Sequence, residues 1–280
     1  MPKRLTVGDA HVTVLSAGRF YAPLAELMTV PAAAQTPLLA AELAQPRLWP
    51  CWAVHIALGP LSILVDPGAY FPGPDDPWGL PYPAPPVDLG HELEAAGIAA
   101  EAVTHVIITH AHEDHYTGAV YARDGIWQPR FPAARHYLGR SDWDELQKNG
   151  TISDSDAGRV LKQLHDWRLL ERMEGIYPLA DGITLIPAPG ETPGHYLLRL
   201  HSRGQTLYCL GDLYHHPLEV EHPAWVAPWA DPMATRRSRH ELAQAALAED
   251  ALLIASHIPT IGRLVPTPTG VSWRAIADLG

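Results

Sequence analysis

The sequence predicts an α/β protein made of two halves whose sheets pack on each other. The first observation is the order of its apolar patterns, which run from strands to helices, back to strands, and then to a helix and a final strand. The second is size, because 280 residues, 47% of them hydrophobic, allow one large domain or two smaller ones with a sizeable core. The third is that polar residues suited to metal binding directly follow several apolar runs.

The N-terminal half is expected to contain four short strands and a helix. The strands are predicted at His11–Leu15, Ala53–Leu58, Leu61–Val65 and Thr104–Thr109. The second and third of them join across Gly59-Pro60 as a hairpin. The helix is predicted over Asp88–Ala96 and ends at Gly97, because glycine readily takes the left-handed conformation that closes a helix.

The C-terminal half begins with two predicted helices. Ser141 can cap a helix that runs through Trp143 and Leu146, and Ser153–Leu170 carries apolar residues near helical spacing. The remaining elements are predicted as three strands, a helix and a last strand: Ile183–Ile186, Tyr196–Leu200, Thr206–Leu210, Asp231–Ala248 and Leu252–Ala255.

Composition limits the cellular compartment and the classes of binding partner that we expect for this protein. The formal net charge of −11 argues against nucleic acid as a partner. Residues 1–9 include basic residues with no apolar core behind them, so they do not form a signal peptide, and no apolar run approaches the roughly 18 residues of a membrane span. We therefore expect a soluble cytoplasmic protein that binds no membrane. Cys51 and Cys209 are expected to be buried thiols, with a disulfide between them as the alternative.

The most informative motif is H-x-H-x-D-H, which follows the apolar run Val106–Ile108. Its polar residues are His110, His112, Asp114 and His115. Imidazole and carboxylate are the usual ligands of zinc and related divalent ions. A strand that ends at this loop can direct all four side chains toward one point, so the motif predicts a metal site; the alternative is a solvent-exposed polar loop.

Further candidate ligands also stand next to strand ends. Asp66, Asp212 and His257 each follow a predicted strand, and His195 precedes one after Pro193-Gly194. A lone histidine beside a strand is usually an ordinary surface or core residue. Their repetition in the same structural context nevertheless indicates that these side chains belong to one metal centre.

With these motifs in place, residues of about 50–260 resemble the metallo-β-lactamase superfamily, whose five motifs appear here in order. The resemblance implies an αββα sandwich with a two-metal site at one edge of the sheets. It also implies a single domain over residues 1–280, with an N-terminal extension at about residues 1–50.

The same resemblance assigns ligands. It implies that His110, His112 and His195 bind the first metal, and that Asp114, His115 and His257 bind the second. Asp212 would bridge the two, and Asp66 would orient metal-binding histidines. The implied cofactors are two divalent ions, with zinc preferred and iron or manganese as alternatives.

The run from Gly211 to Pro217, with Ser256–Pro259, resembles the branch that holds N-acyl-homoserine lactonases and methyl parathion hydrolase. This implies a hydrolase of small esters or lactones, with phosphotriesters as a side activity. One departure is Tyr196, which stands where a small hydroxyl residue is common. Some members have an active-site tyrosine soon after the bridging aspartate, and Tyr214 is near that place.

The expected mechanism uses a hydroxide held between two metals. Asp114 would accept a hydrogen bond from that hydroxide while binding the second metal. Tyr214 or His215 would donate to the charge that develops on the substrate, and the alternative is that both merely pack or face solvent.

Three other functions are considered. A mononuclear iron persulfide dioxygenase of the same fold shares many of these ligands. A nuclease of the same fold is disfavoured by the acidic balance and by the lack of a basic, aromatic stretch for RNA. A metal-binding protein without catalysis is the last alternative. No serine or cysteine nucleophile pattern and no glycine-rich phosphate loop is recognisable.

One or both of two irregular segments are expected to wall the substrate pocket: residues 20–50 and the proline-rich residues 67–87. Their aromatic residues would give the pocket apolar surface, namely Tyr21, Tyr70, Phe71 and Trp78. One segment is also expected to support a homodimer contact. The rival view is that these aromatics only pin the loops to the body of the protein.

Overall fold

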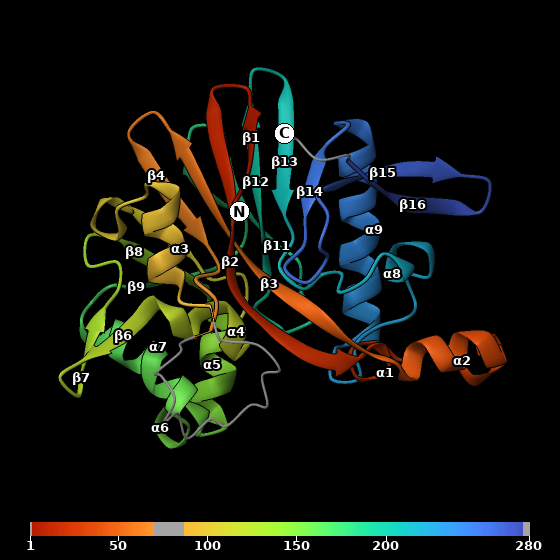
Figure 1. Cartoon of the computed structure of the whole chain (residues 1–280), viewed down its shortest axis with the longest axis horizontal. Coiled ribbons are helices and arrows are strands. Elements are labelled where there is room, and N and C mark those ends of the chain that lie inside the picture. The colour runs from red at the N-terminus through yellow and green to blue at the C-terminus, as the bar shows by residue number, and fades with distance from the viewer. Residues whose placement is uncertain (1, 70–86, 277–280) are drawn as a thin grey trace.

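The computed structural model describes residues 2–69 and 87–276, apart from the side chains at positions 153, 154 and 156. It consists of two seven-stranded sheets that pack face to face, with helices on both outer faces (Figure 1). The predicted α/β class and the αββα sandwich are therefore confirmed.

The first sheet has the strand order β1-β2-β3-β4-β5-β8-β9. Its strands are β1 (Lys3–Val7), β2 (Ala10–Pro23), β3 (Pro46–Leu58), β4 (Leu61–Val65), β5 (His105–Ile107), β8 (Arg135–Gly139) and β9 (Leu170–Met173). The second sheet runs in sequence order: β10 (Tyr177–Ala180), β11 (Ile183–Pro187), β12 (Tyr196–Ser202), β13 (Gln205–Cys209), β14 (Leu252–Ile254), β15 (Gly262–Thr267) and β16 (Gly270–Ala275). A separate hairpin pairs β6 (Val120–Arg123) with β7 (Ile126–Pro129).

Helices cover both outer faces of the sandwich. Those beside the first sheet are α3 (Leu89–Ala96), α4 (Glu113–Tyr116), α5 (Arg140–Lys148), α6 (Thr151–Asp154) and α7 (Asp156–Asp166). Those beside the second sheet are α8 (Leu218–Glu221) and the long α9 (Pro232–Ala248). Two short helices, α1 (Leu24–Leu27) and α2 (Pro37–Ala44), lie on the N-terminal extension.

Three apolar cores follow from this layering, because successive side chains of a strand point to opposite faces. In β4, Ile63 and Val65 face the core between the sheets, while Leu64 faces the core under α3, α5 and α7. Leu198 of β12 likewise faces the other sheet, and Leu197 faces α9. Strands that are buried on both faces explain why the sequence shows continuous apolar runs rather than alternation.

Several predicted boundaries are reproduced. The α3 helix is capped by Asp88, whose Oδ1 accepts from the Gly90 amide at 2.7 Å, and closed by Gly97 with φ of 76°. Asp231 caps α9 in the same way, accepting from the amides of Met233 and Ala234. These local signals are reliable here because each acts on backbone groups within a few residues.

Two predicted helix starts are corrected. The α5 helix begins at Arg140 after Gly139, so Ser141 lies in its first turn and does not cap it. The single helix expected over 153–170 is two helices and a strand. Ser155 accepts from the Gly158 amide at 2.9 Å and starts α7, which ends at Asp166 before β9.

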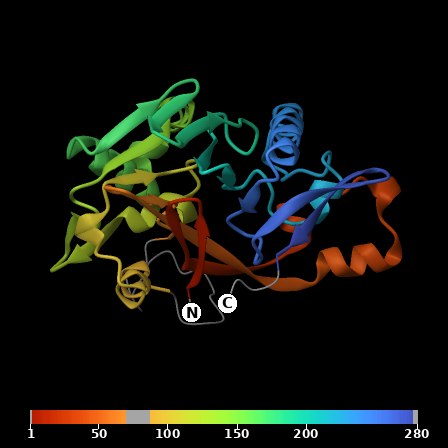
Figure 2. The ribbon, with the colours of Figure 1, turned by 90° about the horizontal axis from the view of Figure 1, so that it is seen from above.

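The N-terminal extension is more regular than predicted. The strand expected at His11–Leu15 is the beginning of the 14-residue β2, which pairs with β3 from His11↔Ala57 to Pro23↔Pro46. This ribbon runs out from the body of the protein and carries α2 at its tip (Figure 2). A small core holds its outer end, with Leu24, Met28 and Trp49 packed against Trp225.

Both cysteines are buried free thiols, as expected. Burial raises the pKa of the Cys51 thiol well above its usual range. Within the described part of the chain, no helix is both long enough and apolar enough to cross a membrane.

The buried His136 of β8 predicts acid sensitivity of the fold. Burial lowers the pKa of its imidazole to about 4, against an opposing effect of the backbone at Ala134 and Leu169. In the unfolded chain the His136 imidazole is therefore protonated below about pH 6.5, whereas in the folded protein it is protonated only below about pH 4. This histidine should contribute a loss of about 3 kcal/mol in stability as the pH falls through that window.

Chemical denaturation of wild type and His136→Gln between pH 7.5 and 4 tests this expectation. The variant should show a shallower fall in the free energy of unfolding. His91→Gln removes an exposed histidine of α3 and should keep the wild-type slope. Equal slopes in His136→Gln and wild type would show that His136 does not cause the acid sensitivity.

Candidate metal centre

The candidate site lies at one edge of the sandwich, where strands of both sheets end. The β4 and β5 strands are parallel and end side by side, which places Asp66 next to the loop that begins at Thr109. The β13 and β14 strands are parallel in the second sheet and bring Asp212 and His257 to the same edge. The Tyr196 amide donates to the Thr109 carbonyl at 2.8 Å, so a main-chain hydrogen bond joins the two sheets at this point.

Four side chains form a first cluster of ligand atoms that all lie within 4.8 Å of one another: His110, His112, Glu191 and Asp212. The Nε2 atom of His110 lies 2.9 Å from Nδ1 of His112 and 3.7 Å from Oδ2 of Asp212. The Oε1 atom of Glu191 lies 3.3 Å from Nδ1 of His112. Two imidazoles and two carboxylates thus converge on one small volume.

A second cluster adjoins the first and shares Asp212 with it. Its three ligand atoms come from His115, His257 and Asp212. Oδ2 of Asp212 lies 3.1 Å from Nε2 of His257 and 3.3 Å from Nε2 of His115. Asp114 completes this side, with Oδ2 at 3.4 Å from Nε2 of His257, and Cys51 Sγ lies 3.6 Å from that oxygen.

Burial and charge at this edge fit divalent cations. His110, His115 and Asp212 are almost wholly buried. Burial would raise the pKa of Asp212, but the imidazoles of His115 and His257 hold it well below its usual range. Two buried atoms in the clusters have no hydrogen-bond partner, Nε2 of His115 and Oδ1 of Asp212. Buried polar atoms are rarely left without partners, so these atoms fit a role as metal ligands.

Asp66 holds the metal-binding loops together, as predicted. Its carboxylate accepts from the amide and the hydroxyl of Thr109, both at 2.8 Å, and lies 2.9 Å from Nδ1 of His115. Ser256, next to His257, donates to the same carboxylate at 3.5 Å. A carboxylate on the far nitrogen of a histidine leaves Nε2 free for a metal and fixes the ring.

Asp142 of α5 is a second buried clamp, which the sequence patterns do not reveal. Its Oδ2 accepts from the Ala111 amide at 2.9 Å and from the Thr192 hydroxyl at 2.8 Å. Its Oδ1 accepts from the Gly194 amide at 2.6 Å. One carboxylate therefore ties the loop of His110 and His112 to the loop that holds Glu191.

The structure separates the two candidates after Asp212. His215 faces the clusters, with Nε2 at 3.4 Å from Oδ2 of Asp212 and 3.6 Å from Oε1 of Glu191. Tyr214 points into the core under α9, where the Arg239 guanidinium lies 4.8 Å from the centre of its ring. The expectation that Tyr214 serves the site is corrected, because adjacent residues of this loop point in different directions.

A buried ion pair sets the path of that loop. Nη2 of Arg239 lies 2.6 Å from Oε1 of Glu219, whose Oε2 accepts from the His215 and His216 amides. Burial lowers the pKa of the His215 imidazole, but Glu191 and Asp212 outweigh it and raise that pKa well above its usual range. Nε2 of His215 therefore faces a carboxylate of each cluster, Glu191 and Asp212.

His195 is buried at the same edge, beside His110 and Asp212. Its Nε2 lies 3.2 Å from the Asp212 amide, and its ring centre is 5.1 Å from that of His110. Glu191, which was not predicted, joins the His110 cluster. Sequence reasoning missed Glu191 because it is a single carboxylate four positions before a histidine, with no spacing pattern that marks it. The other predicted ligands lie in the two clusters, except Asp114, which groups with Cys51 and His257 beside them.

Two cavities open beside the clusters, on either side of His112 and Trp229. One of about 590 Å³ is lined by His112, Glu191, Trp229 and the start of α9. The other, of about 450 Å³, is lined by His112, Asp114 and Trp229. Trp229 is 50% exposed and its Nε1 donates to Oε1 of Glu191. A small molecule that enters here meets an aromatic face and the metal clusters together.

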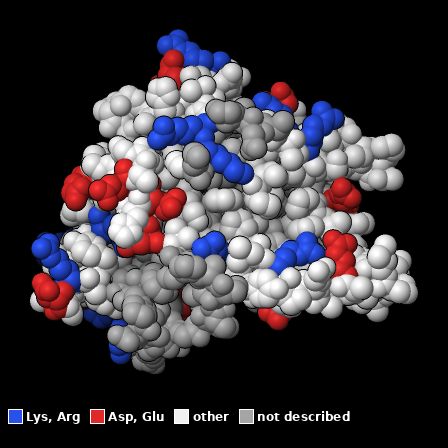
Figure 3. Space-filling view, viewed as in Figure 1, with Lys and Arg blue, Asp and Glu red and all other residues white. Residues whose placement is uncertain are grey.

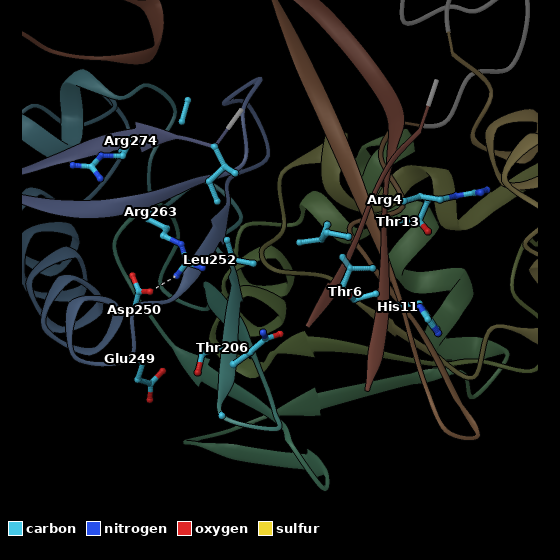
Figure 4. A pocket seen from close by; sticks show the side chains of 16 residues that line it. Arg4, Thr6, His11, Thr13, Thr206, Glu249, Asp250, Leu252, Arg263 and Arg274 are labelled. Carbon is cyan, nitrogen blue, oxygen red and sulfur yellow. Dashed lines mark ion pairs between the residues drawn. The ribbon is translucent and has the colours of Figure 1, made fainter. Parts of the chain in front are cut away.

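A cavity of about 980 Å³ lies elsewhere, and Figure 4 shows it. It is lined by Arg4, His11, Arg263 and Arg274, among others, and the ion pair of Arg263 with Asp250 spans 3.1 Å. None of the cluster residues lines it, so we do not assign it to the chemistry.

The described residues include the first irregular segment and only the ends of the second. Tyr70, Phe71 and Trp78 lie outside the described residues, while Tyr21 is 54% exposed on the ribbon. The ribbon nevertheless reaches the site. The carbonyl of Pro50 lies 2.7 Å from Nδ1 of His257, and the ring of Phe20 meets His257 edge-on with centres 5.1 Å apart.

Comparison with known proteins identifies the family. Residues 47–257 match the profile of the family described as the Metallo-beta-lactamase superfamily. Among curated protein sequences, none matches.

Solved structures resemble the whole chain. AidC, a dizinc quorum-quenching lactonase solved with the product N-hexanoyl-L-homoserine, is 19% identical, with 100% of this chain and 98% of that one covered and a TM-score of 0.80. A probable metal-dependent hydrolase from Staphylococcus aureus is 16% identical, with coverage of 99% and 100% and a TM-score of 0.80. An N-acyl homoserine lactone hydrolase with product at its catalytic metal centre is 20% identical, with coverage of 90% and 94% and a TM-score of 0.64. At these identities the likeness shows the fold.

The Asp142 clamp leads to a prediction about metal affinity. Asp142→Ala leaves the Ala111 and Gly194 amides without their acceptor and frees the two metal-binding loops. We expect metal affinity to fall by about 10- to 100-fold and the free energy of unfolding to fall by about 3 kcal/mol. Titration with a chromophoric chelator and chemical denaturation measure the two effects.

Asp144→Ala is the matched control, since Asp144 is exposed on the same helix. It should leave both quantities near wild type. If Asp142→Ala binds metal as tightly as wild type, the loops do not depend on this carboxylate.

Proposed function

The chain belongs to the metallo-beta-lactamase superfamily, and from that premise we propose that it is a two-metal hydrolase of small esters or lactones. The observation that carries the proposal is the pair of adjoining clusters that share Asp212. A shared carboxylate with imidazoles on both sides is the arrangement expected when two divalent ions act on one substrate. The first ion would be held by the cluster of His110 and His112, and the second by Asp114, His115 and His257.

When bound, such ions lower the pKa of a water molecule and polarise the bond that it attacks. The protein side chains then orient the reactants and handle protons. Asp114 is 31% exposed and lies on the open side of the second cluster, so it is placed to accept a proton from attacking water. His215 is the donor best placed to hydrogen-bond the oxygen on which negative charge develops.

The site favours a small, uncharged substrate with an apolar part. Trp229 and Phe20 supply aromatic surface beside the clusters, and the adjoining cavity of about 590 Å³ has the size of a small-molecule site. The fold likeness to lactonases solved with homoserine products agrees with a lactone or ester. Phosphotriesters remain the proposed side activity, because their phosphoryl oxygen can be polarised in the same way.

The charge of the protein does not favour the alternative that it is a nuclease. The net charge is −11, and on the face in Figure 3 the Lys and Arg side chains form short groups among Asp and Glu. A nucleic-acid site is expected to show a basic band. The mononuclear iron dioxygenase is the second candidate, and metal content separates it from the hydrolase. The homodimer contact and the cytoplasmic location stay predictions.

Metal content is the first prediction from this proposal. Protein purified without chelator should contain close to two equivalents of zinc, iron or manganese per chain by elemental analysis. Two clusters with a common carboxylate provide ligands for two ions. A single tightly bound iron would favour the dioxygenase instead.

Asp212→Ala is expected to lower the hydrolysis of an ester or lactone by several orders of magnitude, because it removes the side chain common to both clusters. The fold should survive, since the sheets pack without it. A panel of lactones, aryl esters and organophosphates, assayed with metal-loaded wild type and variant, measures the effect. Near-normal turnover in the variant would contradict the two-metal mechanism.

A further inference from the structure

We propose that the thiol of Cys51 becomes a thiolate ligand of the second metal, beside the ligands already assigned to that site, and that it gives the site a preference for thiophilic ions such as Cd²⁺. The inference rests on the proposed two-metal centre. It adds one sulfur atom to the predicted ligand set and removes no ligand from either metal. It does not depend on the identity of the substrate.

The sulfur atom of Cys51 lies among the ligand atoms of the second site. Its Sγ is 3.6 Å from Oδ2 of Asp114, and that oxygen is 3.4 Å from Nε2 of His257. The three ligand atoms all lie within 4.8 Å of one another. Zn²⁺ holds nitrogen, oxygen and sulfur ligands at about 2.0–2.3 Å in a tetrahedron, so they stand roughly 3.5 Å apart. The spacing on either side of the Asp114 oxygen already matches this geometry.

A buried nitrogen points to a cation at the same place. Nε2 of His115 has no hydrogen-bond partner among the described residues, although His115 is only 1% exposed. This nitrogen lies 3.6 Å from Oδ2 of Asp114 and 3.3 Å from Oδ2 of Asp212. The other ring nitrogen, Nδ1, contacts Asp66 at 2.9 Å, which leaves Nε2 to a metal. Cys51 therefore stands beside a cation site that other side chains indicate independently.

The main chain fixes Cys51 against the loop of His257. The carbonyl of Pro50, one residue before it, lies 2.7 Å from Nδ1 of His257. The amide of Trp52, one residue after it, donates to the Ser256 carbonyl at 3.1 Å. Cys51 itself is 4% exposed on β3. Because both neighbours of Cys51 are tied to this loop, the thiol is held beside the second site by the backbone.

A thiol binds a metal by losing its proton. The S–H bond breaks, a sulfur–metal bond forms, and the proton passes to solvent, with no change in oxidation state. Burial and the Asp114 carboxylate raise the pKa of the Cys51 thiol, whereas a bound cation deprotonates a thiol that coordinates it. Thiolate sulfur is a soft donor that suits Zn²⁺ and other thiophilic ions, while carboxylate oxygen suits harder ions such as Mn²⁺.

The competing interpretation is that Cys51 only donates a hydrogen bond to Asp114. The sulfur would then stay protonated in the metal-loaded protein and would form no bond to the ion. Cys209 provides the matched control, because it is also a buried free thiol but packs in the apolar core between the sheets. The chain has only these two cysteines, so any metal–thiolate signal must come from one of them.

Three proteins decide between the interpretations: wild type, Cys51→Ser and Cys209→Ser. Each is stripped with a chelator, checked by thermal unfolding, and loaded with Co²⁺ to two equivalents by elemental analysis. A Co²⁺–thiolate bond gives a charge-transfer absorption in the near ultraviolet, which oxygen and nitrogen ligands do not give. Chelator competition with Cd²⁺ and with Mn²⁺ measures the affinity of each protein for the two ions.

We expect the charge-transfer band in wild type and in Cys209→Ser, and its loss in Cys51→Ser. The affinity ratio of Cd²⁺ to Mn²⁺ at the weaker-binding or stronger-binding equivalent that responds should be lower in Cys51→Ser by about tenfold. Absence of the band in loaded wild type, its survival in Cys51→Ser, or an unchanged affinity ratio in that variant would overturn the proposal. If Cys51→Ser does not fold, the band in Cys209→Ser decides, because Cys51 is then the only cysteine present.

Ester and lactone hydrolysis is assayed separately on zinc-loaded wild type. A thiolate band without hydrolysis of any substrate in the panel would refute the proposed function and leave Cys51 as a ligand. Hydrolysis by a wild type that shows no thiolate band would refute the assignment of Cys51 and leave the proposed function standing.

Discussion

The buried carboxylate of Asp66 is the interaction on which the metal edge depends. It lies where β4 ends and accepts hydrogen bonds from Thr109 after β5 and from Ser256 after β14, while it contacts His115. Asp66 itself adopts φ of 51°, a left-handed conformation that a residue other than glycine takes only under constraint. This uncommon backbone conformation occurs at the point where strands of both sheets are joined.

Several ionisable side chains are buried at this edge, although the fold does not depend on them. Asp212, Glu191 and Glu219 are all buried, and His110, His115 and His215 are buried beside them. Burying charged groups is costly unless they are paired or coordinate metals. The surrounding apolar cores do not require these residues, so their placement is a cost in stability that a functional site explains. Metal binding would offset this cost by satisfying the atoms that lack partners.

The N-terminal ribbon shows how an addition to the sandwich reaches the site. Its strands run beyond the sheet and bring Phe20 and Pro50 against His257. The carbonyl of Pro50 fixes the ring of His257 in the way that Asp66 fixes His115, so each of these histidines is oriented by a different part of the chain. Trp229, before α9, lines both cavities beside the clusters.

The sequence by itself determined the layer order, the caps of α3 and α9, and most of the metal-centre residues. These features follow from signals that act over a few residues, such as Asp88 on Gly90, or from polar residues repeated at strand ends. Only the tertiary structure decided that Glu191 joins the His110 cluster, that His215 faces the site while Tyr214 faces Arg239, and that Asp142 joins two loops. Each of those outcomes depends on which way a loop side chain points, and that direction is set by contacts between segments far apart in the chain, as between Gly190 and Thr235.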